Sequence, residues 1–263
     1  MASAGTGVTT RQPSRDQDRR AVAIVGRGRL GKAFAAALRA AGHEVTGPVG
    51  RGEPIGAPRA ALLCVPDGQV AVAAASIAAD VLVGHCSGAL TLDAIGSRPA
   101  FSVHPLLPVA TETTRFAGAF CAVSGNTDDA MRFAAALARD LGMTPFALAD
   151  EFRPLYHAAA TMASNYVVAL LDAAEQVFHR SGVAREAMIP LARAAVDEWA
   201  RLGGERALTG PIVRGDEGTV ERQRAAIDAY APEFSGVWSA VASLTRGLAN
   251  RARTAGPDTA AAR

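Results

Sequence analysis

The stretch that decides the fold is Ala21-Val-Ala-Ile-Val25, followed by Gly26-Arg-Gly-Arg-Leu-Gly31 and the alanine-rich segment Lys32–Ala41. The apolar run ends in glycine, which is typical of a buried parallel strand, and the segment behind the loop has the composition of a helix that stops at Gly42. A GxGxxG sequence between a strand and a helix is the fingerprint of a dinucleotide-binding loop. The stretch therefore predicts a strand–loop–helix unit that holds a pyrophosphate at the helix N-terminus.

The three glycines of this loop have different expected roles. Gly26 permits the tight turn, Gly28 lets a pyrophosphate approach the backbone, and Gly31 allows close packing of helix on strand. The same letters also begin a P-loop, which requires Ser or Thr after its lysine. Ala33 follows Lys32, so the pattern excludes a P-loop nucleotide triphosphatase. A glycine-rich turn without a ligand is the plain alternative.

Downstream of the loop, short apolar runs alternate with helical patterns as far as Asp150. This alternation predicts a doubly wound parallel sheet of the Rossmann type. Further strands are expected at Glu44–Thr46, Ala61–Val65, Val81–Val83, Phe101–Val103 and Phe120–Val123, and further helices at Asp67–Ala79, Leu92–Ile95 and Asp128–Leu141.

After Arg153 no strand pattern follows, and the sequence predicts an all-α domain. Its expected helices are Leu155–His179, Arg185–Leu202, Asp216–Tyr230 and Pro232–Arg253. The predicted organisation is a disordered lead (1–19), a dinucleotide-binding domain (20–150), a helical substrate and dimerisation domain (151–253) and a flexible tail (254–263).

Composition excludes several classes of function. The net charge of +2 over 263 residues leaves no electrostatic footprint for nucleic acid or for an anionic membrane surface. The three cysteines lack metal-site spacing, so no metal is expected, and they indicate reduced, buried thiols in a cytoplasmic protein. Only one of the 27 basic residues is a lysine, so any mechanism that needs a catalytic lysine must use Lys32.

The end of the second predicted strand bears on the choice of dinucleotide. An enzyme that binds NAD usually places an acid there to hold the ribose hydroxyls. Here the strand runs into Thr46–Arg51, with Glu44 at its opposite end, while Arg27, Arg29 and Arg51 could neutralise a 2′-phosphate. We therefore expect NADP, with NAD as the alternative. Solvent exposure is the plain explanation for Arg27 and Arg29.

Polar residues follow several strands at the edge where ligands bind in open α/β sheets. They lie in Val65-Pro66-Asp67, His85-Cys86-Ser87-Gly88, His104-Pro105 and Gly125-Asn126. His104 is a candidate catalytic residue or a histidine bonded to the backbone of a turn, and Asp67 is expected to be a helix N-cap. The residues expected to bind the cofactor are Gly26, Arg27, Gly28, Arg29, Leu30, Gly31, Arg51, Val65, Pro66, Ser87 and Gly88.

A polar stripe runs along the first helix of the second half. His157, Thr161, Ser164 and Asn165 have offsets that place them on one helix face among small and apolar residues. Polar groups on a buried helix require partners, which could be a substrate or a neighbouring helix. Catalytic roles are therefore predicted for His157, Ser164 and Asn165, and a substrate-binding role for Thr161.

The loop Ala207–Thr219 is rich in glycine and polar residues. The guanidinium of Arg214 can hold a substrate carboxylate through two parallel hydrogen bonds. Thr209 and Asp216 are further substrate-binding candidates, and Asp216 could instead cap the next helix or orient Arg214. An exposed structural loop is the alternative.

Five motifs together resemble one bacterial family, which pairs a Rossmann-like domain with the "domain of unknown function 2520". They are Gly26–Gly31, His85–Gly88, His104–Leu106, Tyr156–Ala159 with Ala163–Asn165, and Ala207–Asp216. The family is similar to 6-phosphogluconate dehydrogenase, pyrroline-5-carboxylate reductase and ketopantoate reductase. The resemblance implies NAD(P) in the first domain, a helical domain like the C-terminal domain of 6-phosphogluconate dehydrogenase, and a homodimer built through that domain.

The resemblance also implies a 2-oxo-acid substrate such as ketopantoate, but the mechanism does not transfer whole. Ketopantoate reductases use a lysine on this helix with an asparagine four residues on, and here Thr161 stands at the lysine position before Asn165. We therefore predict an NADPH-dependent reductase of a small 2-oxo acid, with His157 as proton donor and His104 as the second choice. The alternatives are a cyclic imine reductase and a non-catalytic dinucleotide sensor.

Overall fold

The computed structural model describes residues 21–254. The expected disordered lead (1–19) and all but the first residue of the expected tail (254–263) lie outside the described residues. Contacts divide the chain into a first unit that ends at Ser164 and a second that begins at Asn165. The boundary expected near Asp150 lies earlier, because the helix that follows it packs with the first unit.

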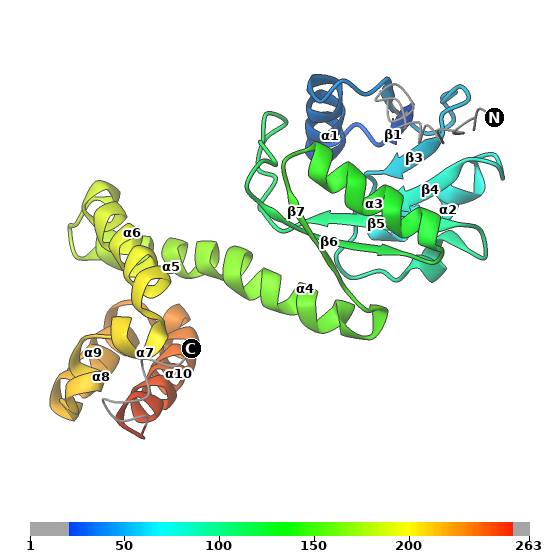
Figure 1. The fold of residues 1–263 in the computed structure, drawn as a ribbon. Coiled ribbons are helices and arrows are strands. Elements are labelled where there is room, and N and C mark those ends of the chain that lie inside the picture. Colours follow the sequence, from blue (N-terminus) through cyan, green and yellow to red (C-terminus); the bar gives the residue numbers. More distant parts are fainter. Residues whose placement is uncertain (1–20, 255–263) are drawn as a thin grey trace, which may run out of the picture. The chain divides into compact units, whose positions relative to one another are not determined.

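The first unit is built on a seven-stranded sheet with the order β2-β1-β3-β4-β5-β6-β7 (Figure 1). The strands are β1 (Val22–Val25), β2 (Val45–Val49), β3 (Ala60–Leu63), β4 (Leu82–His85), β5 (Ala100–Pro105), β6 (Phe120–Gly125) and β7 (Thr144–Ala147). The order reverses at β1, which lies between β2 and β3. This is the topological switch point of a Rossmann-type sheet, where ligands bind.

The predicted doubly wound sheet of the Rossmann type is confirmed, but its last two strands run against the direction of the others. β6 pairs antiparallel with β5, and β7 runs parallel to β6. The connection between β5 and β6 holds no helix to carry a parallel crossover, so the chain turns back on itself. Gly125-Asn126 therefore lies at the edge opposite His104, where Asn126 Oδ1 accepts from the Ala100 N–H at 2.8 Å.

Helices cover both faces of the sheet (Figure 1). On one face, α1 (Arg29–Ala40) and α3 (Asp128–Asp140) bury their apolar sides against alternate strand residues such as Ile24 and Phe101. On the other face, α2 (Val70–Ala75) and the 3₁₀ helix η3 (Leu92–Ile95) pack against Ala23 and its neighbours. The predicted helix Asp67–Ala79 is shorter than expected and begins with the 3₁₀ turn η2 (Asp67–Gln69). The three cysteines are free and buried, as predicted.

The second half of the chain begins with a short 3₁₀ turn, η4 (Asp150–Phe152), and then one interrupted helix rather than the single α-helix expected. α4 (Arg153–Thr161) passes into a π-helical turn (Met162–Tyr166) and then into α5 (Val167–Arg180). The π turn changes the helix register between Thr161 and Val167, so the offsets of a regular α-helix do not hold through it.

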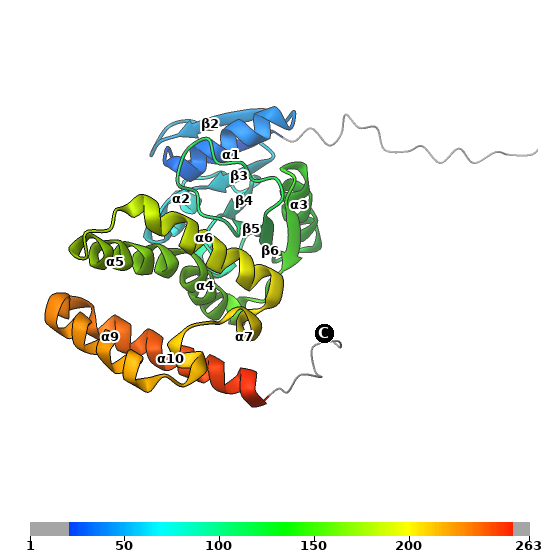
Figure 2. The same ribbon diagram turned by 90° about the vertical axis from the view of Figure 1, so that its left-hand side faces the viewer.

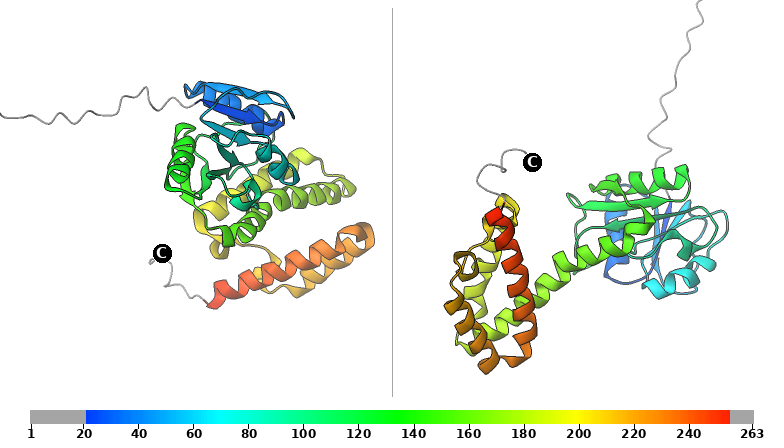
Figure 3. Two further views of the ribbon diagram at one scale, coloured as in Figure 1. Left: turned by 90° about the vertical axis from the view of Figure 1, so that its right-hand side faces the viewer. Right: turned by 90° about the horizontal axis from the view of Figure 1, so that it is seen from below.

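The second unit is entirely helical in its described part. After α5 come α6 (Arg185–Leu202), α7 (Gly204–Ala207), α8 (Pro211–Arg214), α9 (Glu217–Tyr230), η6 (Pro232–Phe234) and α10 (Ser235–Thr254). α10 packs against α7, α8 and α9, and it runs beside α9 (Figures 2 and 3). Across residues 21–254, no helix has the length and apolar character needed to cross a membrane.

Candidate active site

The glycine loop has the geometry that a pyrophosphate site requires. Gly26 has φ +120°, and a Cβ on it would lie only 2.2 Å from the carbonyl oxygen of Cys64. A Cβ on Gly31 would lie only 2.0 Å from the carbonyl oxygen of Gly26. Gly28 has no atom within 4 Å of that position, so its backbone faces open space. Gly28 is also the N-cap of α1, and neither a side-chain cap nor a first-turn acid covers this helix end. The residues present therefore fit a dinucleotide phosphate.

A cavity of about 710 Å³ opens beside this loop at the ends of β1, β2 and β3. Of the predicted cofactor residues, its lining includes Gly26, Arg27, Gly28, Arg51, Val65 and Pro66. Ile55, Val72 and Ile77 add an apolar wall. The cavity thus combines a backbone cradle for phosphates with an apolar wall that could receive a flat ring.

The arginines at this end do not all face the cavity. Arg27 Nη2 lies 2.6 Å from the Glu53 carboxylate, which also accepts from the Gly50 N–H at 3.0 Å. Arg51 donates to Gln69 Oε1 at 2.5 Å, whereas Arg29 donates to the Ala110 carbonyl at 3.1 Å, in the segment between β5 and β6. The expectation that no acid stands near the end of the second strand is therefore wrong. Glu53 lies four residues beyond β2 and lines the cavity.

Leu30 and Gly31, two further residues of the glycine loop that were predicted to bind the cofactor, have packing roles. Leu30 is partly buried against the core of the first unit. Gly31 is buried within α1, against β3. Both support the position of the loop rather than offering polar groups to a ligand.

A second cluster lies at the other end of the same sheet edge. His104 ends β5, and its Nδ1 is 2.8 Å from the Tyr156 hydroxyl of α4. The rings of His104 and His157 have centroids 5.9 Å apart. A Cβ on Gly88 would lie 2.6 Å from His157 Nδ1 and 2.8 Å from His104 Nε2. Gly88 and His104 therefore lie together at the sheet edge, as predicted, and the structure also brings His157 and Tyr156 of α4 to this place.

Burial sets the charge state of this cluster. Desolvation, followed by the charges of His157 and Arg153, lowers the pKa of His104 to about 4. Desolvation also raises the pKa of Tyr156 to about 12. At neutral pH His104 is consequently uncharged and Tyr156 is protonated.

Ser87 and Asp67 form a hydrogen bond to each other. Asp67 was predicted to cap a helix and Ser87 to contact the cofactor. Ser87 Oγ donates to Asp67 Oδ2 at 3.0 Å and accepts from the N–H groups of Ala89 and Leu90. The prediction that Asp67 caps a helix is wrong, because Pro66 is at the cap position and no side chain caps η2. The hydroxyl of Ser87 thus shapes the loop that carries Gly88.

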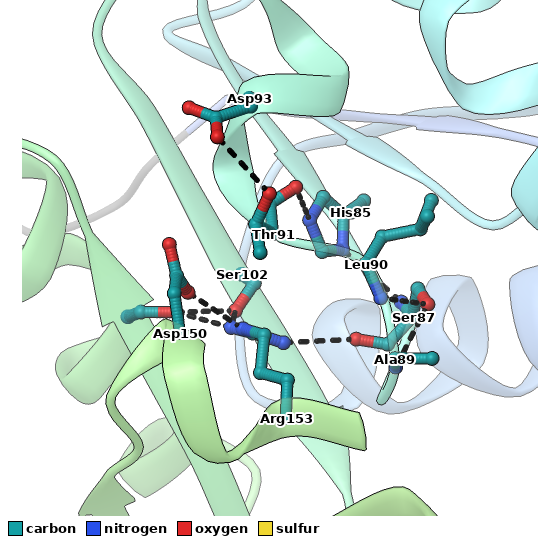
Figure 4. Close-up of polar contacts among 10 residues, drawn as sticks. His85, Ser87, Ala89, Leu90, Thr91, Asp93, Ser102, Asp150 and Arg153 are labelled. Atoms are coloured by element: carbon teal, nitrogen blue, oxygen red, sulfur yellow. Dashed lines mark hydrogen bonds and ion pairs between the residues drawn. The ribbon is translucent and has the colours of Figure 1, made fainter.

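Arg153 is the largest fully buried side chain of the described chain, and sequence reasoning assigned it no role. Its guanidinium donates to Asp150 Oδ1 at 2.8 Å, to the Ser87 carbonyl at 3.2 Å and to the hydroxyls of Ser102 and Ser124 (Figure 4). Asp150 belongs to η4 and Ser87 to the loop that follows β4, whereas Ser102 lies in β5 and Ser124 in β6. Arg153 therefore fixes the first turn of α4, which carries Tyr156 and His157, onto the sheet.

The expected polar stripe is not on a buried helix. Arg153 is the only buried residue of α4, and the π turn and α5 contain none. Thr161 and Ser164 are half-buried and belong to the first unit, whereas Asn165 is exposed and begins the second. The regular offsets predicted a stripe that the π turn interrupts.

The three loop candidates lie in the second unit. Asp216 is the N-cap of α9, where its Oδ1 accepts from the Thr219 N–H at 3.0 Å. Hydrogen bonding from the side chain of Thr219, followed by that from its backbone, lowers the pKa of Asp216. Arg214 is exposed at the end of α8, and its side chain makes no hydrogen bond or ion pair among the described residues. Thr209 lines an apolar groove of about 600 Å³ formed by α5, α9 and α10. The capping role left open for Asp216 is thus confirmed.

Residues 119–245 match the family model DUF2520, whose description is a domain of unknown function. These residues are a DUF2520 domain. It begins in the sheet at β6, so it includes Arg153, Tyr156 and His157 as well as Arg214. The predicted pairing of a Rossmann-type region with the DUF2520 domain is confirmed. No protein of curated function matches the chain in sequence.

Solved structures share the fold of nearly the whole chain. A Bacteroides fragilis protein provisionally designated an NADP oxidoreductase has a TM-score of 0.74 at 15% identity, over 87% of this chain and 98% of that one. A Thermotoga maritima protein has a TM-score of 0.70 at 23% identity, over 88% and 99%. The pyrroline carboxylate reductase of Plasmodium falciparum, solved with NADP bound, has a TM-score of 0.55 at 10% identity, over 88% and 98%. At these identities the likeness shows the fold.

Proposed function

We propose that the chain is an NADPH-dependent oxidoreductase that reduces the carbonyl of a small 2-oxo acid, with ketopantoate as the first substrate to test. The observation that carries this proposal is the shared sheet edge. The open Gly28 backbone stands at one end, and an uncharged His104 beside His157 stands at the other. Neighbouring folds with NADP in their names support the same cofactor.

The chain's own groups supply the contacts that a 2′-phosphorylated dinucleotide needs. The free amides at the start of α1 would bind the pyrophosphate. Arg27, Arg51 and the Gly50 N–H lie together where a 2′-phosphate would compete with the Glu53 carboxylate. When bound, NADPH would supply the hydride that reduces the substrate.

The two histidines take different roles because their environments differ. His104 has a pKa of about 4 and is uncharged at pH 7, so it can donate a hydrogen bond to the substrate oxygen but carries no surplus proton. His157 is exposed, so its ring is open to solvent. We therefore assign His157 as the general acid and His104 as the group that orients and polarises the carbonyl.

Residues nearer the second unit complete the proposal. The π turn follows Thr161 and holds Ser164 and Asn165, and this type of helix irregularity is frequent at functional sites, so we keep these three residues as candidates for contact with the substrate. In the second unit, Arg214 is the candidate clamp for a carboxylate and Thr209 is a further candidate for substrate binding, while Asp216 fixes the start of α9.

A cyclic imine is the second candidate substrate. The chain has Thr161 rather than lysine on this helix, and a protonated iminium already carries the activating charge that a lysine would provide. The fold shared with a pyrroline carboxylate reductase also favours this reading. A panel that includes both 2-oxo acids and cyclic imines separates the two.

We also propose a homodimer formed through the helical unit, in the cytoplasm. The described part of this unit buries only Met188 and Val220 among its larger apolar side chains. Leu191, Trp199 and Leu244 are each more than half exposed. A second copy could cover this apolar surface. Sedimentation should give a dimer, and a Trp199→Glu variant should shift it toward monomer.

Nicotinamide fluorescence titrations with NADPH and NADH test the cofactor, and absorbance assays against 2-oxo acids and cyclic imines test the reaction. We expect tighter binding of NADPH and oxidation by at least one 2-oxo acid. His157→Ala and His104→Ala should each lower turnover by about 100-fold or more. Near-normal turnover in both variants would overturn the histidine assignment, and tight NADPH binding without turnover would indicate a sensor.

A further inference from the structure

Tyr156 makes a specific contact that the roles assigned above do not use. It is half-buried on α4, and its hydroxyl lies 2.8 Å from His104 Nδ1 with the two rings at 85° to each other. The ring of Phe146 in β7 also contacts that of Tyr156, with centroids 6.0 Å apart and an angle of 67° between the ring planes. Two aromatic contacts and the buried Arg153 at the start of the helix thus hold the hydroxyl at this nitrogen.

The direction of this hydrogen bond decides the tautomer of His104. A neutral imidazole has one bare nitrogen, which accepts, and one N–H, which donates. Burial keeps His104 neutral and Tyr156 protonated. A phenol hydroxyl donates readily to a bare ring nitrogen, and in that arrangement Nδ1 accepts from Tyr156 and the ring proton lies on Nε2.

The other nitrogen of His104 lies beside Gly88 and His157. Cε1 and Nε2 of His104 are each 2.8 Å from the position that a Cβ on Gly88 would occupy, and His157 Nδ1 is 2.6 Å from it. A side chain at position 88 would therefore collide with both rings, which explains the glycine. Within residues 21–254 no group hydrogen-bonds to His104 Nε2, so this nitrogen has no partner in the described chain.

We propose that Tyr156 is a positioning residue that fixes His104 as its Nε2–H tautomer, so that His104 offers an N–H donor to the oxygen of a bound substrate. The part that concerns a substrate rests on the proposed function. The tautomer does not, because it follows from the Tyr156 contact in the free protein. A wrong tautomer would present a bare nitrogen to the substrate oxygen and repel it.

Proton–nitrogen correlation NMR of the histidine rings in the full chain reads the tautomer directly. We expect His104 Nε2 to resonate as an N–H nitrogen and Nδ1 as a bare nitrogen at pH 7. In Tyr156→Phe the Nδ1 signal should shift and the second tautomer should become populated. An Nδ1–H tautomer in the unmodified chain overturns the proposal, whether or not the variant folds.

Kinetics then test the consequence. Tyr156→Phe should lower kcat by roughly 10-fold to 100-fold with little change in KM, because orientation of the donor is lost and binding is not. Tyr230→Phe is the matched control, since it removes a hydroxyl from a tyrosine that is 76% exposed on α9. An unchanged tautomer and unchanged kcat in Tyr156→Phe would refute the positioning role. Absence of turnover with every substrate, alongside the expected tautomer, would refute the proposed function alone.

Discussion

Polar groups are exposed to solvent at one end of the ligand-binding edge of the sheet and buried at the other. Near β1 and β2, the ion pair of Arg27 and Glu53 is exposed, with 62% and 39% of the two side chains accessible. Near β4 and β5, Arg153 and His85 are fully buried, and both side chains form hydrogen bonds to neighbouring residues of the first unit. Exposed pairs contribute little to stability, whereas buried polar groups are costly when a partner is lost. Variants at the first end should therefore change ligand affinity, and variants at the second should change stability and catalysis.

Arg153 gives the largest expected effect. Arg153→Met should lower the free energy of unfolding by about 3 to 5 kcal/mol, because the buried contacts to η4, β5 and β6 are lost together. Urea denaturation measures the change. Arg132→Met is the matched control: Arg132 also pairs with an aspartate three residues before it, but on an open surface, and should cost less than about 1 kcal/mol. Equal costs in the two variants would contradict the contrast between the two ends.

Acid should give the second largest effect, because it destabilises the folded chain at the buried end near β4 and β5. Burial, followed by the charge of Arg153, lowers the pKa of His85 to about 4, whereas an unfolded histidine titrates near 6.5. Between these values the unfolded chain binds the extra proton and the folded chain does not, so stability falls as pH falls from about 6.5 towards 4. The loss for His85 should approach about 3 kcal/mol below pH 4.

Unfolding free energies measured from pH 7 to pH 4.5 test this expectation. His85→Gln should show a shallower slope over this range than the unmodified chain, whatever its stability at pH 7. The prediction fails if both proteins lose stability in parallel.

Glu53 gives the smallest expected effect. Glu53→Gln removes the carboxylate that competes for Arg27 and the Gly50 N–H, so NADPH should bind about fivefold more tightly, which corresponds to about 1 kcal/mol. The effect should shrink as salt rises. Glu112→Gln is the control, since Glu112 forms a comparable exposed ion pair with Lys32 of α1. Weaker NADH binding with unchanged NADPH binding would instead make Glu53 a ligand of the ribose hydroxyls.

Local chemistry explains what could be predicted from the sequence. Gly26–Gly31 lies in one strand–loop–helix unit, so its role could be predicted from adjacent residues alone. The strand that was not predicted, β7, has the sequence Thr-Pro-Phe-Ala, and its proline weakens any strand signal. The reversal at β6 could have been inferred, because residues 106–119 carry no helical pattern for a parallel crossover.

The buried end could not be derived in the same way, because its contacts join distant residues. Tyr156 lies 52 residues from His104, and Arg153 lies 51 from Ser102. An arginine is exposed in most proteins, so its identity gave no hint of burial. The available signal was Ser102 and Ser124, whose hydroxyls interrupt apolar strands and must find buried partners.

Deuterium transfer tests the central claim most directly. The chain is incubated with NADPH that carries deuterium at the transferable nicotinamide position, together with ketopantoate and a panel of other 2-oxo acids. The product should carry deuterium on the former carbonyl carbon, and His157→Ala should form it at least about 100-fold more slowly. Absence of deuterated product from every 2-oxo acid, with NADPH bound, would contradict the proposed reduction.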